Sequence, residues 1–283
     1  MIADIVVDLQ YGDCGKGKIA HNLCRINDYT HVIRYNGGCN AGHTIFHEGK
    51  KFITHHIPCG VFFGIKSIIG PGCVLRPDKF LEEVKTLEDS GFDTSIDMPE
   101  LEPFLIDIYS ELHKDSDSPV ILFEGAQGFG LDIDWGDYPY VTSSHCTVGS
   151  ALMNGVPPQA VRDVWGVAKI YETYVGKKEF HGKDDIFDEI RELGNEYGST
   201  TGRPRQVNWL DMDMLETAIR VNGVSKLVIN KMDILDQVGI WRLFEGLNLY
   251  EFETSKDIEF WIEDKSQAMG VEEIFFSRSP EHI

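Results

Sequence analysis

The sequence predicts an α/β fold in which a mainly parallel central sheet is flanked by helices. Its short β-branched runs are almost wholly apolar, as expected of strands that are covered on both faces. Stretches with helical spacing of apolar residues separate these runs, and such alternation is typical of α/β proteins. Four of the apolar runs lie at residues 67–69, 120–123, 164–170 and 226–229.

The first elements expected along the chain are a strand, a glycine-rich loop and a helix. Residues 2–9 form an apolar, β-branched run, and residues 12–17 hold three glycines. Residues 18–26 can then form a helix, and a second strand is expected at residues 29–34. This order of strand, loop and helix suits the binding of phosphate.

The remaining helices are expected where Pro and Gly mark their ends or apolar residues recur at helical spacing. The first begins at Pro77, because proline is favoured in the first turn, and ends before Gly91. The others are expected at residues 103–113, 184–193, 210–221 and 256–269. In the last helix, Phe260 and Trp261 are predicted to face the core, and the acidic stretch at residues 251–263 is predicted to be its solvated face.

Composition and charge exclude several classes of function. The chain has 283 residues, of which 26 are Lys or Arg and 46 are Asp or Glu, so its formal net charge is −20. General attraction to nucleic acid or to an anionic membrane is therefore not expected. No apolar run approaches the roughly 18 residues of a spanning helix, and the acidic Asp4 does not suit a secretory signal.

The prediction is a cytoplasmic protein with no membrane or nucleic-acid partner. Its six cysteines show no C-x-x-C pair and are expected to be reduced thiols. No linker or internal repeat interrupts residues 1–283, which are expected to form a single domain.

A phosphate-binding motif follows the first strand. Gly12-Asp13-Cys14-Gly15-Lys16-Gly17-Lys18 has the G-x-x-x-x-G-K spacing of a P-loop, in which backbone N–H groups and lysines hold phosphate oxygens. The fold is therefore expected to be P-loop NTPase-like. Ile19 stands where a P-loop usually has the Ser or Thr that ligates Mg²⁺, so Asp13 is the candidate metal ligand. A glycine-rich turn with solvated lysines is the alternative interpretation.

A second motif predicts recognition of guanine. Asn230-Lys231-Met232-Asp233 ends an apolar run and has the pattern N-K-x-D. The Asp233 carboxylate can accept hydrogen bonds from N1–H and the exocyclic amine of guanine, a donor pair that adenine does not offer. A regulatory GTPase would also need D-x-x-G at the end of a strand. Asp163-Val164-Trp165-Gly166 has these letters but opens its strand, which disfavours a switch.

Three further polar loops are candidates for binding or catalysis. The glycine-rich loop at residues 34–44 includes His43, which can donate or accept a proton near neutral pH. Residues 124–128 follow a buried strand, where open α/β sheets bind ligands. An acid-free loop carries Arg203 and Arg205, whose guanidinium groups suit carboxylates or phosphates. A structural histidine and a solvated basic turn are the alternatives.

Together these segments resemble the adenylosuccinate synthetase family. The similarity extends over most of the chain and is carried by residues 10–18, 34–44, 123–130, 132–134, 138–144, 194–203, 209–211 and 231–233. It implies a carbon–nitrogen ligase of purine nucleotide biosynthesis that uses GTP and Mg²⁺. Such a ligase phosphorylates the 6-oxygen of a 6-oxopurine nucleotide, after which the amino group of L-aspartate displaces phosphate.

The resemblance also implies a role for each matching residue. Asp13 is the base that removes the purine N1 proton and meets the metal with the Gly42 carbonyl, and His43 is the catalytic acid. The GTP residues are Gly12, Gly15, Lys16, Gly17, Lys18, Asn230, Lys231, Asp233 and Ser277. The purine nucleotide residues are Asp13, Asn40, Gln127 and Thr142, and the aspartate residues are Thr200, Thr201, Arg203 and Arg205. A homodimer is the implied assembly.

The chain departs from the family pattern at several of these places. Cys14 replaces a glutamate, Pro204 and Gln206 interrupt an arginine run, and residues 174–180 alter a turn of small residues near the ribose. No Gly/Thr-rich segment lies between residues 91 and 120, where the family carries a loop that grips the substrate's 5′-phosphate. An arginine that reaches into the partner subunit normally follows that loop. Recognition of the substrate phosphate is therefore expected to be rebuilt or lost.

Several substrates and two other classes of function stay open. Inosinate (IMP) is the first expectation, because a compact branch that acts on deoxyguanylate (dGMP) tends to carry a small residue where this chain has Asp13. Since this chain is also compact, dGMP is second, and another 6-oxopurine compound is third. A GTP-binding switch would hydrolyse GTP without aspartate. A catalytically silent homologue is favoured by the missing segment and disfavoured by the retained Asp13, Lys16, His43 and Arg203.

Overall fold

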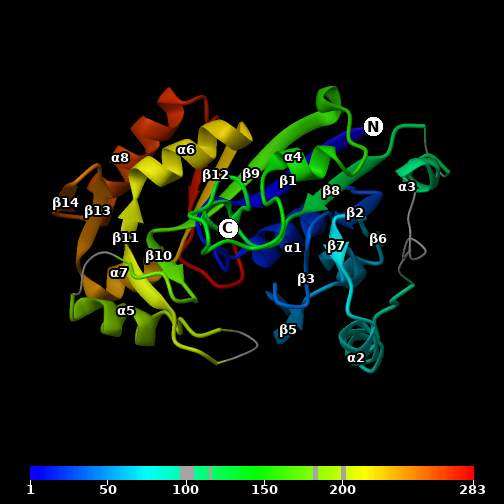
Figure 1. Cartoon of the computed structure of the whole chain (residues 1–283), viewed down its shortest axis with the longest axis horizontal. Helices are drawn as coiled ribbons and strands as arrows, with labels where there is room; N and C mark the ends of the chain where they lie inside the picture. The colour runs from blue at the N-terminus through cyan, green and yellow to red at the C-terminus, as the bar shows by residue number, and fades with distance from the viewer. Residues whose placement is uncertain (96–104, 115–116, 181–183, 199–201) are drawn as a thin grey trace.

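A seven-stranded parallel sheet forms the centre of the molecule. The structure, a computed structural model, describes residues 1–95, 105–114, 117–180, 184–198 and 202–283. The strand order is β15-β12-β9-β1-β8-β2-β6, and every neighbouring pair runs parallel. Figure 1 shows these strands following one another across the molecule, from β12 on the left to β6 on the right. The predicted α/β fold with a parallel central sheet is confirmed.

Helices alternate with the strands along the chain. The strands of the central sheet are β1 (Ile2–Asp8), β2 (His31–Arg34), β6 (Lys66–Ile69), β8 (Val120–Glu124), β9 (Val161–Lys169), β12 (Lys226–Asn230) and β15 (Glu273–Phe276). The described α-helices are α1 (Lys16–Ile26), α2 (Pro77–Glu88), α3 (Leu105–Leu112), α4 (Val148–Leu152), α5 (Ile186–Leu193), α6 (Met212–Asn222), α7 (Met232–Val238) and α8 (Ser255–Ala268). In the part of the chain that the structure describes, no helix has the length and apolar character needed to cross a membrane.

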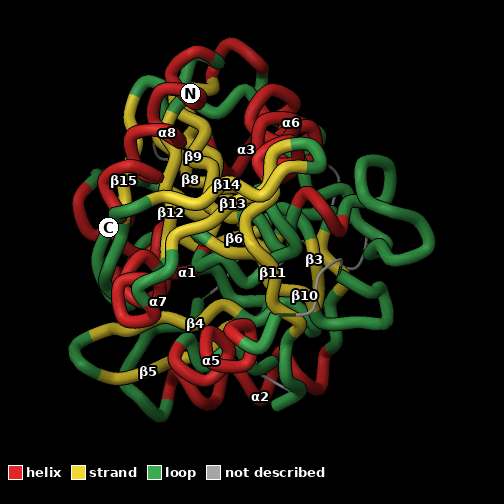
Figure 2. The backbone as a smooth tube through the Cα atoms, turned by 90° about the vertical axis from the view of Figure 1, so that its left-hand side faces the viewer, coloured by secondary structure: helices red, strands yellow, loops and turns green. Residues whose placement is uncertain are grey.

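Smaller sheets lie beside the central one. A four-stranded sheet has the order β10 (Tyr171–Tyr174), β11 (Gln206–Asp211), β13 (Trp241–Glu245) and β14 (Asn248–Phe252). Strands β4 (His43–His47) and β5 (Lys50–Thr54) form a hairpin, and β3 (Gly37–Gly38) pairs with β7 (Cys73–Val74). The side view in Figure 2 shows the hairpin, α5 and α2 together at the lower end of the molecule.

Apolar side chains cover both faces of the central sheet. Ile5 and Val7 of β1 belong to a core cluster that includes residues of α6 and α8. Val6 belongs to a second cluster, with Ile19 and Leu23 of α1. Because successive side chains of a strand point to opposite faces, the two clusters lie on the two sides of the sheet. This burial explains why the strands are almost wholly apolar. That the whole chain is a single domain stays a prediction.

The structure differs from the predicted elements at several places. The sequence pattern did not predict the β4–β5 hairpin or the strands β13 and β14, each of which has five residues. Strands β4, β5 and β13 mix buried residues with more accessible ones, and β14 is mostly exposed, so none of the four is an apolar run. The helix expected at residues 210–221 begins at Met212, because the preceding residues complete β11. Helix α3 begins at Leu105, and residues 103–104 of the predicted helix lie outside the described residues.

Helix α8 corrects one prediction about the core. Phe260 is 71% exposed, whereas Trp261 is partly buried and packs 5.1 Å from the ring of Phe252. Residues four apart share a helix face, so Ile258 and Ile262 form the buried face and Phe260 points away from it. The acidic stretch is also divided, since residues 248–252 belong to β14 and the helix starts only at residue 255.

Two substitutions in α8 test this assignment of faces. Ile262→Ala is expected to lower the free energy of unfolding by about 2–5 kcal/mol, because it removes buried methyl groups and leaves a cavity. Phe260→Ala is the matched control and is expected to change it by less than about 0.5 kcal/mol. Urea denaturation measures both variants, and equal losses would contradict the assigned faces.

Candidate active site

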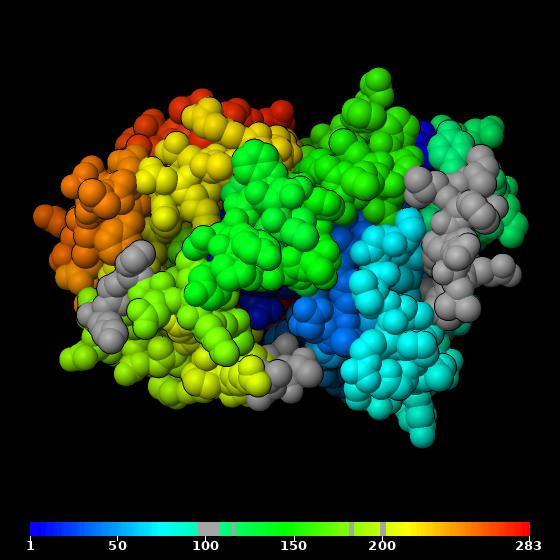
Figure 3. Space-filling view, viewed as in Figure 1, coloured from blue at the N-terminus to red at the C-terminus, as the bar shows by residue number. Residues whose placement is uncertain are grey.

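The loops that carry the predicted motifs meet at the carboxyl ends of the central strands. The P-loop follows β1, the loop with His43 follows β2, and Gln127 follows β8. Lys169 ends β9, and Asn230 ends β12. Open α/β sheets bind their ligands at this edge. A cavity of about 1050 Å³ lies there, and Figure 3 shows a hollow at the centre of this face with dark-blue N-terminal residues at its floor.

The cavity brings together most of the residues that the sequence analysis assigned to ligands. Its walls include Gly12, Asp13, Gly15, Lys16, Gly17, Lys18, Asn40, Gly42, His43, Gln127, Thr142, Arg205, Asn230, Lys231 and Asp233. Ser277 is buried and, like Arg203, is not among the wall residues. Thr200 and Thr201 lie outside the described residues.

The P-loop is folded around the buried carboxylate of Asp8, the last residue of β1. Oδ1 accepts hydrogen bonds from the backbone N–H groups of Gln10 at 3.0 Å and Gly12 at 3.1 Å. Oδ2 accepts from the N–H of Cys14 at 3.1 Å and from Lys16 Nζ at 2.9 Å. One side chain therefore accepts hydrogen bonds from three backbone N–H groups and from Lys16, and these bonds fix the curvature of the loop.

Backbone conformation explains the glycines of the loop. Gly12 and Gly15 have φ angles of 83° and 100°, which favour glycine because a Cβ is strained there. Asp13 also has a positive φ, 57°, as residues at functional sites sometimes do. A Cβ on Gly17 would lie 2.8 Å from the Cβ of His43, so this glycine lets α1 pack directly against the histidine.

Lys18 joins the P-loop to the N-K-x-D motif. Its Nζ donates to Oδ1 of Asn230 at 2.5 Å, to Oγ of Ser277 at 2.7 Å and to the carbonyl of Ser279 at 2.9 Å. Burial lowers the pKa of Lys18 to about 8. Asn230 Nδ2 in turn donates to the carbonyl of Cys14 at 2.6 Å. In this arrangement Lys18 and Ser277 tie the two motifs together, and protein oxygens occupy the ammonium group of the lysine.

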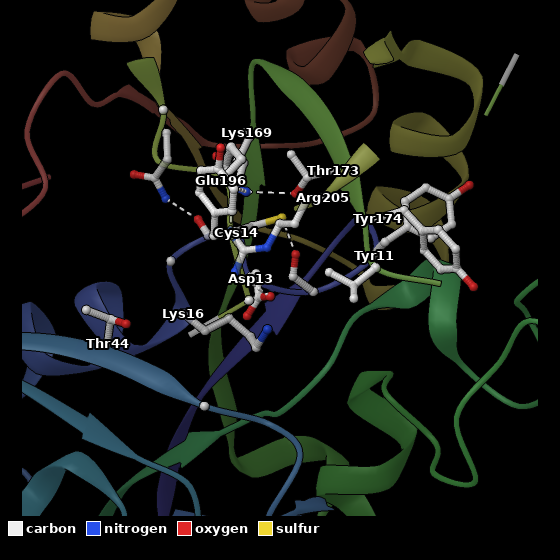
Figure 4. Close-up of a pocket in the computed structure, with 18 of the residues that line it drawn as sticks. Tyr11, Asp13, Cys14, Lys16, Thr44, Lys169, Thr173, Tyr174, Glu196 and Arg205 are labelled. Atoms are coloured by element: carbon white, nitrogen blue, oxygen red, sulfur yellow. Dashed lines mark hydrogen bonds and ion pairs between the residues drawn. The ribbon is translucent and has the colours of Figure 1, made fainter. Parts of the chain in front are cut away.

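Asp13 lies against an arginine of the predicted aspartate loop. Arg205 Nη2 donates to Oδ2 of Asp13 at 2.8 Å, and Nη1 donates to Oε2 of Glu196 at 2.5 Å. Lys169 Nζ also donates to Oε2 of Glu196, at 2.8 Å. Figure 4 shows these four side chains in one line, with Lys16 beyond Asp13. The catalytic candidate is therefore joined to the arginine loop by direct contact.

Glu196 is the centre of this network. Its Oε1 accepts from the hydroxyl of Tyr171 at 2.8 Å and lies 3.9 Å from Nζ of Lys231. Burial raises the pKa of Glu196, but Lys169, Lys231 and Arg205 outweigh it and lower that pKa to about 2. The carboxylate is therefore ionised at neutral pH, and it holds cations from β9, the arginine loop and the N-K-x-D motif around one point.

His43 is buried between two charged groups. Its Nδ1 lies 2.5 Å from Oε1 of Glu124, and Arg34 Nη1 lies 2.9 Å from its Nε2. Burial lowers the pKa of His43, Arg34 lowers it further, and together they outweigh Glu124 and bring it to about 4. Glu124 also accepts from the N–H of Cys59 at 2.9 Å. The imidazole is therefore neutral at pH 7 in the ligand-free protein, with Nδ1 assigned as the protonated nitrogen because a carboxylate only accepts.

The predicted purine residues Gln127, Thr142 and Asn40 line the same cavity as Asn230. Gln127 Nε2 donates to Oγ1 of Thr142 at 2.7 Å, and the backbone carbonyl of Gln127 accepts from Lys16 Nζ. Asn40 lies on the wall with its side chain exposed. The amide and hydroxyl groups of these residues provide both hydrogen-bond donors and acceptors, which suit the edge of a purine base.

The metal prediction depends mainly on Asp13. Its carboxylate stands on the cavity wall beside the P-loop, and Gly42 lies on the same wall. Mg²⁺ is commonly held by one or two carboxylates together with substrate phosphate oxygens, so this donor set fits it. The described residues hold one cluster of three metal-type ligands, Asp132, Asp134 and His145, and Asp13 is not part of it.

Sequence reasoning gave no site role to Asp8, Lys169 or Glu196, and it named Glu124 only as the first residue of the candidate loop at residues 124–128. Asp8, Glu124 and Lys169 have a recognisable signal, since each is a charged residue that directly follows an apolar run and ends a strand of the sheet. Glu196 has none of this kind, because it lies in a loop and its role depends on partners far away in the sequence.

The Asp8–Lys16 pair is expected to contribute strongly to stability. Asp8→Asn leaves the buried Lys16 without its counter-charge, so we expect the free energy of unfolding to fall by about 3–5 kcal/mol. Glu82→Gln is the matched control, because Glu82 pairs with Lys79 at 2.7 Å on the exposed face of α2, and its effect should stay below about 1 kcal/mol. Urea denaturation compares the two, and similar losses would contradict the structural role of Asp8.

The lowered pKa of His43 predicts a pH dependence of stability. Between about pH 6.5, the usual histidine value, and about pH 4, the value in the fold, the unfolded chain binds the proton and the folded one does not. The contribution of His43 to stability is therefore fully present above about pH 6.5 and is lost as the pH falls toward 4. Over this range the free energy of unfolding should fall by up to about 1.4 kcal/mol per pH unit. Denaturation of wild type and His43→Asn from pH 4.5 to 7.5 measures this, and an unchanged slope in the variant would refute it.

Comparison with known proteins identifies relatives of this chain. The sequence model of the adenylosuccinate synthetase family matches residues 5–99 and 95–247. The adenylosuccinate synthetase of Deinococcus radiodurans is 34% identical, over 81% of this chain and 80% of the relative. That of Listeria welshimeri is 31% identical, over 97% of this chain and 90% of the relative. The first alignment spans 328 positions, more than the 283 residues of this chain, so the relative holds segments that this chain lacks.

Two solved structures share the fold. A fully ligated adenylosuccinate synthetase from Plasmodium falciparum has a TM-score of 0.76 at 23% identity, over 98% of this chain and 97% of that one. The succinoaminodeoxyadenylate synthetase of cyanophage S-2L, bound to dGMP and dATP, has a TM-score of 0.65 at 20% identity, over 93% and 99%. Since the family model matches most of the chain and relatives above 30% identity cover about four fifths of it or more, the chain belongs to the adenylosuccinate synthetase family of ligases.

Proposed function

We propose that the protein joins the amino group of L-aspartate to C6 of a 6-oxopurine nucleotide, first of all IMP, at the expense of GTP. One observation carries the proposal: the P-loop, the N-K-x-D motif, Asp13 and Arg205 line a single cavity of about 1050 Å³. Two nucleotides and one amino acid have to meet in this reaction, and bringing them to one point supplies much of the catalysis.

GTP is proposed to lie with its phosphates on the P-loop and its base at Asp233. Backbone N–H groups of the loop and the N-terminus of α1 favour anions, and Lys16 stands beside them. Asp233, in the first turn of α7, is on the cavity wall and can accept from the guanine donors. Lys231 Nζ donates to the carbonyl of Gly194 at 2.7 Å, which leaves its aliphatic stem to lie along the base.

In the first half of the proposed reaction, Asp13 removes the N1 proton of the purine. The 6-oxygen then attacks the γ-phosphorus of GTP, and GDP leaves. Arg205 occupies one oxygen of Asp13 in the ligand-free protein. Because the carboxylates of substrate aspartate compete for the same guanidinium, we expect their arrival to release Asp13 as the base.

In the second half, the amino group of aspartate attacks C6 and phosphate leaves. Arg203, Arg205, Thr200 and Thr201 are proposed to hold the two carboxylates of aspartate. Glu196 holds Arg205 in place from the side away from Asp13. This second contact keeps the guanidinium at the cavity wall while its other edge changes partner.

His43 is proposed to stabilise the charge that develops on the transferred phosphoryl group. Its imidazole is neutral without ligand, because burial and Arg34 lower its pKa to about 4. A phosphate dianion beside it favours the protonated form, and Glu124 already stands at Nδ1 to pair with an imidazolium. Mg²⁺, when bound, neutralises phosphate charge, and Asp13 with the Gly42 carbonyl would hold it.

The same chemistry on dGMP is the second candidate. The chain shares its fold, over 93% of its length, with the cyanophage enzyme that was solved with dGMP. A homodimer is the proposed assembly, on the basis of family membership. A GTPase switch is disfavoured, because Asp163 pairs in register with Asp4 in the first half of β1. It therefore lies toward the edge of the sheet opposite the P-loop.

The test is phosphate release with GTP, Mg²⁺ and aspartate against IMP, dIMP, GMP and dGMP, with mass spectrometry of the succinyl adduct. We expect an adduct with IMP and a loss of at least about 100-fold in rate for Asp13→Ala, since a positioned base contributes about 10²–10⁴-fold. An adduct with dGMP alone would select the second candidate. Release of phosphate from GTP when no nucleoside monophosphate is present would instead indicate a switch. Binding of GTP without turnover in any mixture would indicate a silent homologue.

A further inference from the structure

The cations of the cavity are not equally available to a ligand. Among the wall residues, Lys16 pairs with Asp8, Arg205 pairs with Asp13 and Glu196, and Lys169 pairs with Glu196. Lys231 lies 3.9 Å from Glu196, and Nζ of Lys18 lies within hydrogen-bonding distance of four oxygens. Within the described ranges, only Lys51 and Lys177 are wall lysines whose ammonium groups have no hydrogen-bond or ion-pair partner. An additional anionic group therefore has two candidate partners.

Lys177 belongs to a turn that is held firmly on one side by Gln206. The turn follows β10, and Gln206 at the start of β11 donates from Nε2 to the carbonyls of Gly176 at 3.1 Å and Lys178 at 2.7 Å. The N–H of Phe180 donates to Oε1 of the same glutamine at 3.4 Å. One amide side chain therefore binds the backbone at the residue before Lys177, at the residue after it and at Phe180.

The other side of the turn is held by Lys178 and aromatic rings. Lys178 Nζ lies 3.2 Å from Oδ2 of Asp137 and 5.2 Å from the centre of the Tyr11 ring. Tyr11, Tyr174 and Phe180 pack together with ring centres 5.3 to 5.7 Å apart. Of the two adjacent lysines, one is thus used to dock the turn, and Lys177 is left to line the cavity.

The position of the turn indicates which ligand Lys177 meets. Asp137, to which the turn is docked, belongs to the segment between Leu131 and Thr142, the wall of the proposed purine nucleotide. Figure 4 shows Tyr174 and Tyr11 on one side of Asp13 and Lys16, and Thr44 on the other. Lys51 lies in the β4–β5 hairpin, which begins beside Thr44, at that other side.

We propose that Lys177 binds the 5′-phosphate of the purine nucleotide substrate and that Gln206 positions the turn that carries it. The inference rests on the proposed function, because it assigns the phosphate of that reaction's nucleotide. A phosphate monoester is a compact dianion near neutral pH, and a lysine ammonium meets it as a point charge. In a chain of net charge −20, such a group needs a local cation.

The proposal predicts discrimination between a nucleotide and its nucleoside. Titration calorimetry of IMP and inosine, with GTP absent, should show tighter binding of IMP to the wild-type protein. Lys177→Ala should weaken the binding of IMP by about tenfold, as expected for loss of one charge-assisted hydrogen bond. The affinity for inosine should stay unchanged. Lys177→Arg should restore most of the difference. Gln206→Ala should also weaken the binding of IMP. Lys51→Ala is the matched control and should leave the affinity for IMP unchanged.

Steady-state kinetics with the same variants separates the two phosphate ligands. The KM for the purine nucleotide should rise in Lys177→Ala while the KM for GTP stays unchanged. A rise in the KM for GTP alone would place Lys177 on the triphosphate and overturn the assignment, as would equal loss of IMP and inosine. Weakened IMP binding in Lys51→Ala but not in Lys177→Ala would also overturn it. If no nucleotide gives product, the proposed ligase function fails, whereas the calorimetric comparison still decides the role of Lys177.

Discussion

The buried carboxylate of Asp8 is the constraint on which the rest of the site depends. It ends the central strand β1 and accepts from three backbone N–H groups and Lys16, so the P-loop has its shape without a ligand. A Cβ on Gly128 would lie 2.5 Å from Oδ1 of Asp8, so the loop after β8 closes directly onto the same group. Asn230 then attaches the N-K-x-D motif to the P-loop through the Cys14 carbonyl. Three loops are thereby placed relative to one carboxylate.

A strongly acidic chain forms its anion site by holding a few cations with buried carboxylates. Asp8 holds Lys16, Glu196 holds Lys169 and Arg205, and Glu124 holds Arg34. Buried ion pairs of this kind are weak evidence for net stability, because desolvation opposes the attraction between the charges. Their effect here is geometric: Lys16, Lys169 and Arg205 stand at the cavity wall before phosphate or carboxylate arrives, so little reorganisation is needed when charge develops.

The sequence predicts what depends on neighbouring residues and misses what depends on the fold. The P-loop, the N-K-x-D motif and the apolar strands are local patterns, and the structure confirms the elements that carry them. Glu196 could not be predicted as the partner of Lys169, because the two residues are joined only by the placement of β10 and the arginine loop. The prediction that Phe260 faces the core is wrong, because adjacent residues of a helix point in different directions and Phe260 is exposed beside the partly buried Trp261.

Two of the departures from the family pattern contact each other, and a third has a partner of its own. Gln206, which interrupts the arginine run, binds the backbone of the altered turn at residues 176–178. Cys14 donates to Oε1 of Gln10 at 3.1 Å, which an ionised glutamate at that position could not do. The altered turn lies at the cavity wall proposed for the purine nucleotide, and Asp13 and Arg205 are in direct contact. The proposed reactive groups and the proposed grip on the substrate phosphate are therefore held by separate sets of side chains, so one can differ from the family pattern while the other does not.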